Sequence, residues 1–217
     1  MKPLHYILLA GALALAGRSA QAQQRNPSEA ATAEQRLVED IGALPAALTP
    51  SAAGDVRNTS TLFQTGAGNN ASIDQRSLSN LSNQAYIVQA GAANVLGIIQ
   101  SGGDNRAYMS QQGNGNRADF TQNGQGNSSN LTQRGSNNRL QGLVSGNDNE
   151  LNIQQNGANN QVQSEIRQND RTYNISQIGY GNTLTQKETT TQSPQGYSVE
   201  MRGAGINITI EQGRVGR

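Results

Sequence analysis

The 217-residue sequence contains no cysteine and no tryptophan, and its single histidine is His5. Without cysteine the chain has no disulfide, no thiolate metal ligand and no thiol nucleophile. Because His5 lies in the segment interpreted below as a signal peptide, serine–histidine pairs and histidine metal sites are also excluded. We therefore expect no enzymatic activity, no metal site and no cofactor.

Apolar residues are scarce as well. Hydrophobic residues make up 34% of the chain and aromatic residues 4%, a composition typical of disordered or low-complexity chains. The formal net charge is +1, which gives no electrostatic reason to expect nucleic acid or an anionic membrane as a partner. No motif indicates a small-molecule substrate.

Residues 1–22 have the pattern of a secretory signal peptide. Lys2 gives a positive start, an apolar stretch follows over 7–16, and residues 20–22 fit the small-x-small cleavage rule. The apolar stretch is too short to cross a bilayer, so we expect a secreted mature chain that begins at Gln23.

Residues 23–57 differ in composition from everything that follows. They are rich in Ala, Glu and Pro, and two interpretations remain open: a weak amphipathic helix over 28–41, or a flexible leader. We expect this segment to lie at the periphery of the fold.

From Asn58 onward the sequence repeats with a period of 11 residues. The unit is Asn-x-Φ-x-Φ-x-Gln-x-Gly-x-x, where Φ is usually apolar or small. Its first position recurs 14 times, and insertions near 77–80 and 188–194 interrupt the count. Three units have another residue at this position, namely Arg171, Gln195 and Ile206. The remaining units form the Asn set Asn58, Asn69, Asn83, Asn94, Asn105, Asn116, Asn127, Asn138, Asn149, Asn160 and Asn182.

Two further positions keep the same phase. The Gln set, six residues on, is Gln64, Gln75, Gln89, Gln100, Gln111, Gln122, Gln133, Gln155, Gln177 and Gln212. The Gly set, eight residues on, is Gly66, Gly91, Gly102, Gly113, Gly124, Gly135, Gly146, Gly157, Gly179 and Gly203. Low-complexity drift would not hold three residue types in phase over this length.

Within each unit, apolar and polar residues alternate, which predicts a seven-residue strand with one buried face. The remaining x-Gly-x-x should reverse the chain, because glycine adopts positive φ at low cost. The predicted core is Leu62, Ile73, Ile87, Leu96, Ile98, Met109, Phe120, Leu131, Leu140, Leu151, Ile153, Val162, Tyr173, Ile175, Leu184, Val199, Ile208 and Ile210. The predicted fold is an all-β, two-sheet cross-β solenoid of about seven stacked 22-residue coils over 58–213, with a basic tail at 214–217.

Stacking would align the Asn and Gln sets from coil to coil. Aligned amides can hydrogen-bond along the stack as they do in cross-β fibres, and they fix the register. A solenoid also has two open edges, which soluble solenoids block with polar caps. Here the first unit, 61–64, and the last, 206–210, carry apolar residues that an adhesive end would have rather than a polar cap, so the pattern favours end-to-end addition of further copies.

The motif Gln-x-Gly-x-x-Asn-x-Ala-x-x-x-Gln at 64–75, 100–111 and 111–122 resembles the repeat of the curlin family of curli fibre subunits. The resemblance implies an extracellular, cell-surface amyloid fibre of bacterial origin that supports biofilm and adhesion. It also implies polymerisation with itself and with other curlin subunits, after export through the outer-membrane curli pore with accessory factors. By analogy, 23–57 would carry the export signal, although this segment lacks the Gly/Asn-rich leader of the family.

The resemblance leaves the choice between major and minor subunit open. Residues 83–91 resemble the opening repeat of the minor, nucleating curlin. Irregular units at 160–171, the interruption at 187–194 and Arg202, Arg214 and Arg217 fit a specialised end. Ordinary repeat decay with a solvated tail explains the same features.

Other interpretations remain. A secreted, soluble solenoid that binds ice or a glycan would need a regular outward row of one residue type, and the outward row is mixed. A repeat stalk of an adhesin or phage is a weaker alternative. Asp104, Asp148 and Asp170 lie near turns, where weak Ca²⁺ binding is conceivable, but they lack the pattern of calcium β-rolls and are better explained as solvated turn residues.

Overall fold

The computed structural model describes residues 58–77, 80–189 and 195–213. The predicted signal peptide, leader and basic tail lie outside this range and stay predictions. Among the described residues, no helix is long and apolar enough to cross a membrane.

The described chain is built of β-strands, each made by one repeat unit. The strands are β1 (Thr59–Ala67), β2 (Asn70–Ser77), β3 (Gln84–Ala92), β4 (Val95–Gly103), β5 (Arg106–Asn114), β6 (Arg117–Gln125), β7 (Ser128–Ser136), β8 (Arg139–Ser145), β9 (Glu150–Ala158), β10 (Gln161–Ile166), β11 (Thr172–Tyr180), β12 (Thr183–Glu188), β13 (Gly196–Ala204) and β14 (Asn207–Gln212).

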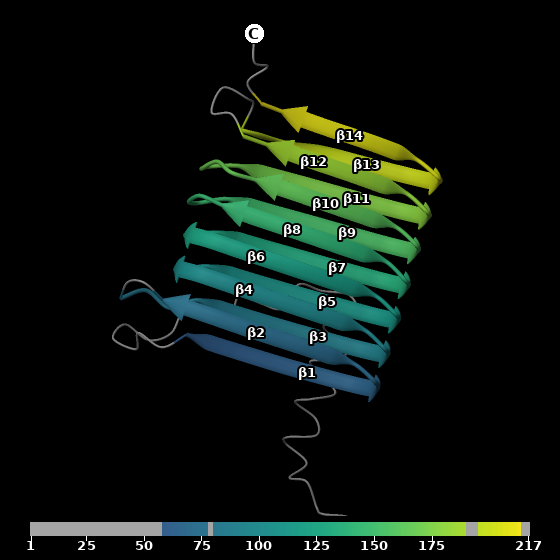
Figure 1. Ribbon diagram of the computed structural model, residues 1–217, viewed down its shortest axis with the longest axis horizontal. Helices are drawn as coiled ribbons and strands as arrows, with labels where there is room; N and C mark the ends of the chain where they lie inside the picture. Colours follow the sequence, from purple (N-terminus) through teal and green to yellow (C-terminus); the bar gives the residue numbers. More distant parts are fainter. Residues whose placement is uncertain (1–57, 78–79, 190–194, 214–217) are drawn as a thin grey trace, which may run out of the picture. The chain divides into compact units, whose positions relative to one another are not determined.

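These strands form two seven-stranded parallel sheets (Figure 1). The odd sheet has the order β1-β3-β5-β7-β9-β11-β13, and the even sheet has the order β14-β12-β10-β8-β6-β4-β2. One odd and one even strand make a coil, and equivalent residues of successive coils pair in register, as Gln89 does with Gln111. The predicted all-β solenoid of about seven 22-residue coils is confirmed.

The strand ends differ from the prediction. Most strands contain nine residues rather than seven, because the Gly set lies inside the strand, one residue before its end. The chain reverses two residues after that glycine, at a left-handed position with φ between 54° and 69°. This position holds Gly68, Ala93, Asp104, Gly115, Gly126, Asn137, Asp148, Asn159, Asp170, Gly181 and Gly205, residue types among which Gly, Asn and Asp tolerate that conformation best.

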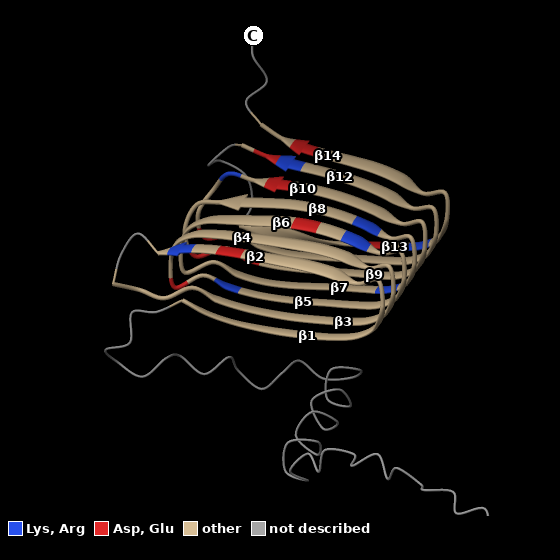
Figure 2. Cartoon of the chain, turned by 60° about the horizontal axis from the view of Figure 1, so that its bottom comes forward, with Lys and Arg blue, Asp and Glu red and all other residues tan. Residues whose placement is uncertain are grey.

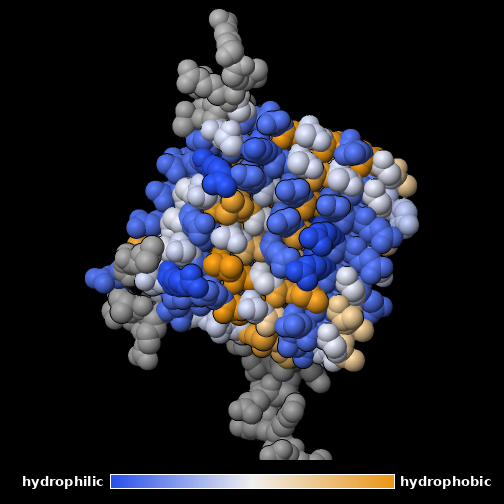
Figure 3. Space-filling view, in the orientation of Figure 1, coloured by the Kyte–Doolittle hydropathy of each residue, from blue (hydrophilic) through white to orange (hydrophobic). Residues whose placement is uncertain are grey.

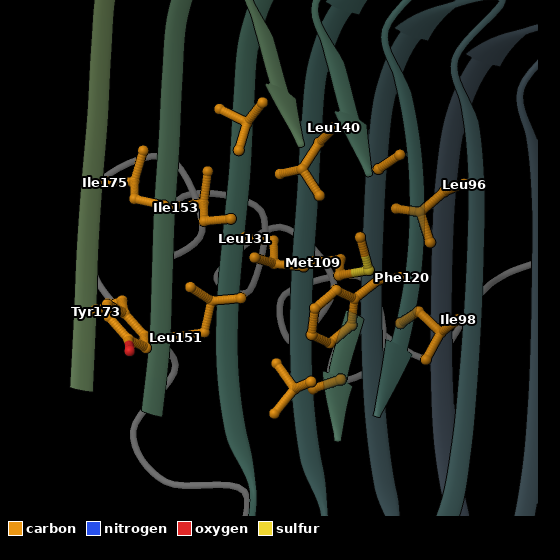
Figure 4. Close-up of a cluster of buried hydrophobic side chains, with 14 of the residues drawn as sticks. Leu96, Ile98, Met109, Phe120, Leu131, Leu140, Leu151, Ile153, Tyr173 and Ile175 are labelled. Atoms are coloured by element: carbon orange, nitrogen blue, oxygen red, sulfur yellow. The ribbon is translucent and has the colours of Figure 1, made fainter. Parts of the chain in front are cut away.

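Apolar side chains from both sheets meet between them and form the core (Figure 4). Thirteen of the predicted core residues are buried: Ile87, Leu96, Ile98, Met109, Phe120, Leu131, Leu140, Leu151, Ile153, Val162, Tyr173, Ile175 and Leu184. Ile73, Val199, Ile208 and Ile210 are partly buried and pack against them. Each core side chain is covered by the coils above and below, which is why the partly buried ones lie in the first and last coils.

Leu62 departs from the prediction, because 46% of its surface is exposed. It lies in β1, the first strand of the odd sheet, where no earlier coil covers it. The prediction also left out three apolar residues that take the place of glutamine, namely Val144, Ile166 and Met201, all of which are buried.

Charged residues are scattered over the strands with both signs interspersed (Figure 2). Several form local pairs within one strand, such as Arg117 with Asp119 at 2.9 Å. Such exposed pairs contribute little to stability. The face drawn in Figure 3 likewise mixes hydrophilic and apolar residues. This face therefore does not show a regular row of one residue type.

Candidate functional site: amide ladders and sheet edges

The side chains of the Asn set lie one above another at the start of each strand. From Asn83 to Asn160, and again at Asn182, they are buried. Up to Asn160, the later Asn donates from its backbone N and from Nδ2 to Oδ1 of the Asn one coil earlier, as Asn138 does to Asn116 at 3.1 Å for both bonds. Asn182 donates to Asn160 Oδ1 from its backbone N. The resulting Asn ladders run along both sheets, with every Oδ1 directed toward the C-terminal coils.

Nδ2 of these asparagines has a second acceptor, a carbonyl oxygen near the end of the next strand along the chain, which belongs to the Gly set except at Asn149, where it is Gln168 O. Asn116 donates to Gly135 O at 3.0 Å, and Asn138 donates to Gly157 O at 3.0 Å. Both amide hydrogens are thereby used inside the stack. A buried amide is tolerated only when it is satisfied in this way.

The side chains of the Gln set form a second series at the far end of each strand. In the odd sheet, Nε2 of each glutamine donates to Oε1 of the next coil in an unbroken Gln ladder. This ladder runs Gln64–Gln89 (2.5 Å), Gln89–Gln111 (2.7 Å), Gln111–Gln133 (2.7 Å), Gln133–Gln155 (2.8 Å) and Gln155–Gln177 (2.9 Å). The donor direction is opposite to that of the Asn ladders.

The Gln ladder of the even sheet is shorter. It runs from Gln75 through Gln100 to Gln122, with bonds of 2.7 and 2.8 Å, and Gln122 then donates to Ser129 Oγ at 2.9 Å. Beyond it the glutamine position holds Val144, Ile166 and Glu188 before Gln212. Within the described residues, Oε1 of Gln212 has no hydrogen-bond partner, as expected because the carboxylate of Glu188 below it cannot donate when ionised.

Glycine is needed at the positions of the Gly set because successive coils approach each other closely there, more than because the chain reverses nearby. At Gly113 φ is +114°, and a Cβ there would overlap the carbonyl oxygen of Gly135 in the next coil. The same overlap recurs at Gly66, Gly91, Gly102, Gly124, Gly135, Gly157 and Gly179 with the next glycine, and at Gly146 with Gln168. Only a residue without a side chain lets successive coils approach this closely.

One coil replaces both amides by charges. In the coil β11–β12, Arg171 takes the Asn position and Glu188 the Gln position, and Arg171 Nε lies 3.2 Å from Glu188 Oε1. The side chains are 7% and 0% exposed. Burial, together with the neighbouring Glu188 carboxylate, raises the pKa of Tyr197 to about 12. A buried pair of this kind is costly to break, because the remaining charge would be unpaired.

The two ends of the stack are the exposed sheet edges. At one edge, β1 and β2 carry Asn58 and Asn69, which are half-buried, and Gln64, which is exposed. At the other, β13 and β14 carry Gln195, Met201, Ile206 and Gln212 in the same positions. All four ladder positions hold amides at the β1–β2 edge, whereas two of the four hold apolar residues at the β13–β14 edge.

The turn acids do not come together as a metal site. Among the described residues, no three acidic or histidine side chains are grouped closely enough to hold an ion. Oδ1 of Asp104 lies 2.8 Å from Nη2 of Arg106 in the same turn region.

Comparison with known families gives one match. The model of the curlin associated repeat matches residues 91–124 and 102–135, which span the end of β3 to β7. Comparison with curated proteins gave no match. The matched region contains unbroken stretches of both ladders, from Asn94 to Asn127 and from Gln100 to Gln133. This chain therefore carries the curlin associated repeat, and its likeness to the curlin family lies in the residues that build the ladders.

Proposed function

We propose that this protein is a structural subunit of extracellular amyloid fibres of the curli type, which assembles when further curlin chains stack on its open sheet edges. The observation that carries the proposal is the pair of amide ladders that run in register through a parallel stack. Hydrogen bonds that join coil to coil within one chain have the geometry needed to join the last coil of one chain to the first coil of another.

The first coil supports edge addition. Strand β1 is a nine-residue edge strand without proline or charge, and Leu62 on it is 46% exposed. Native proteins normally protect such an edge with charges, proline or a covering segment. Among the described residues, no charge, proline or covering segment protects this edge, and with Asn58 and Gln64 in ladder positions it is suited to accept a strand.

The resemblance to curlins supplies the biological setting of the proposal. Residues 1–22 would direct export and 23–57 would engage the outer-membrane pore and its accessory factors. Fibres at the cell surface would then support adhesion and biofilm. No catalytic step is part of this function.

The test is assembly of the purified mature chain. Thioflavin fluorescence should rise after a lag, and sonicated fibres should shorten the lag of fresh protein. Fibre diffraction should give the spacing of about 4.8 Å between strands. A protein that keeps fixed β-structure and stays monomeric at all concentrations would refute the proposal and favour a soluble binding solenoid. The mixed outer surfaces give no support to an ice-binding or glycan-binding face.

A further inference from the structure

The ladders give the two sheet edges different chemistry. Since each Gln Nε2 donates toward the C-terminal coils, the carbonyl oxygens of Gln64 and Gln75 face out of the β1–β2 edge. Since each Asn Oδ1 accepts from the next coil, the backbone N–H groups of Asn58 and Asn69 face out of that edge as well. The β1–β2 edge thus presents two amide acceptors and two donors, and it requires Gln donors and Asn acceptors from an incoming coil.

The opposite edge does not supply that set. Toward the last coil, Gln177 Nε2 meets the thioether of Met201, at 3.5 Å, in place of a glutamine oxygen, and a thioether cannot donate to a further glutamine. Asn182 Oδ1 accepts from Ile206 N at 3.1 Å, and the side chain of Ile206 cannot accept from a further asparagine. Two of the four ladder positions at the β13–β14 edge are therefore closed by apolar side chains.

A junction between two copies of this chain would bring these positions together. In register, Met201 would stack on Gln64 and Ile206 on Asn69. The Gln64 oxygen and the Asn69 N–H would then be buried without a partner, which is unfavourable. A chain whose last coil carries Asn and Gln in all four positions would satisfy every group.

We infer, on the basis of the proposed function, that this chain templates growth at its β1–β2 edge only. The partner that fits this edge is a different curlin-repeat chain with an Asn/Gln last coil. The β13–β14 edge ends the stack. The chain is then a terminal unit of the fibre, whose own copies join poorly.

The first test restores the missing positions. The triple variant Gln195→Asn, Met201→Gln, Ile206→Asn gives the last coil the full ladder set. It should elongate on its own sonicated fibres roughly tenfold faster than the unmodified chain does, because two buried groups per junction regain partners. The matched control is Ser198→Asn, Glu200→Gln, Thr209→Asn, which changes outward positions of the same strands. Equal elongation rates for the triple variant and the unmodified chain, or equal acceleration by the control, would overturn the inference.

The second test identifies which of the two edges accepts new chains. Its seeds carry none of the three substitutions, so any effect of these substitutions on seed stability does not enter. Thr59 N donates to Asn83 O of the next coil, so the N–H of Ser60 faces the opposite way, out of the β1–β2 edge. Thr183 N donates to Ile206 O of the following coil, and in a strand the N–H two residues on faces the same way. The N–H of Thr185 and of its register partner Thr209 therefore faces the same way, which at Thr209 is out of the β14 edge. Proline at either position blocks one edge without removing a bond inside the stack.

The seeds are folded chains that carry one of these prolines and no other substitution. They are added at a low ratio to the triple variant, which serves as the monomer. Thr209→Pro seeds should shorten the lag as the unmodified chain does, and Ser60→Pro seeds should not. Loss of seeding by Thr209→Pro with retention by Ser60→Pro would assign the opposite edge and overturn the inference. If none of these proteins forms thioflavin-positive fibres, the proposed function fails; if all elongate and seed alike, only the edge assignment fails.

Discussion

Arg171 and Glu188 are paired inside the solenoid, with Nε 3.2 Å from Oε1, at the positions where the repeat unit has Asn and Gln. They come from opposite sheets, because the start of an odd strand faces the end of the following even strand. The pair makes the coil β11–β12 chemically distinct from its neighbours. Among near-identical repeats, such a coil has only one register in which both charges are buried together.

Breaking this pair should destabilise the C-terminal coils strongly. Glu188→Gln leaves the Arg171 guanidinium buried without its carboxylate, which typically costs about 3–5 kcal/mol. Guanidinium chloride unfolding at concentrations below assembly measures the effect. The double variant Arg171→Asn, Glu188→Gln restores the amide arrangement of the other coils and should recover most of the loss. A double variant as unstable as the single one would contradict this account of the pair.

A second prediction concerns the Gln ladder in the middle of the odd sheet. Gln111→Leu removes the acceptor of Gln89 Nε2 and the donor to Gln133 Oε1. Gln133 Oε1 would lose its side-chain donor, and Gln89 Nε2 would keep only its bond to Asn70 O. The loss of these buried bonds should lower the free energy of unfolding by about 2–5 kcal/mol. Gln112→Leu changes the adjacent exposed side chain and serves as the control, with an expected change below about 0.5 kcal/mol. Similar losses for both variants would show that the ladder bonds add little.

The Gly set offers a sharper contrast. Gly113→Ala places a methyl group against the Gly135 carbonyl oxygen, so successive coils would have to separate, and we expect loss of the folded stack. Gly181→Ala is the matched control: φ is +64° there and no atom lies within 4 Å of the added carbon. The control should cost only about 1–2 kcal/mol, the penalty of the left-handed conformation. Circular dichroism and thermal unfolding distinguish the two; equal tolerance would mean that the glycines serve the backbone angle alone.

Alkaline pH should weaken the last coils. The pKa of Tyr197 is raised from 10.0 to about 12 by burial and by the Glu188 carboxylate, so the folded state favours the neutral phenol. The stabilisation is fully present below pH 10 and is lost as the pH rises toward 12, because the unfolded chain ionises first. Tyr197→Phe should flatten this decline in denaturation midpoints measured between pH 9 and 12. Tyr180→Phe, at an exposed tyrosine, is the control and should leave the decline in place.

The 11-residue period was sufficient to predict the two-sheet solenoid, because each unit alternates inward and outward residues and the period fixes how coils pair. The period could not predict contacts across the two sheets, which depend on how opposing strands are offset. Contacts along one sheet, by contrast, follow from the period: the register partner of Phe120 in β8, 22 residues on, is Gly142, where a Cβ would lie 2.5 Å from the ring. A signal for the Arg171–Glu188 pair did exist, since both depart from the repeat within one coil.

The 11-residue period also could not predict the residue at which each strand ends. The repeat unit shows that glycine recurs, but glycine can serve at two places: the stacked position inside the strand, or the left-handed reversal two residues later. Backbone angles separate them, with φ of +114° at Gly113 and +66° at Gly115. Only the first excludes a side chain through contact with the next coil, which explains why Asn137 and Asp148 can occupy the second.

The opposite donor directions of the two ladders have an electrostatic consequence for a long fibre. Each Asn amide has its oxygen toward the C-terminal coils, and each Gln amide has its oxygen toward the N-terminal coils. Their dipoles are antiparallel along the stacking axis, and strand dipoles contribute little. Where Asn and Gln occur in equal number, added coils leave the axial side-chain dipole near zero, so no charge separation builds up between the ends as the stack lengthens.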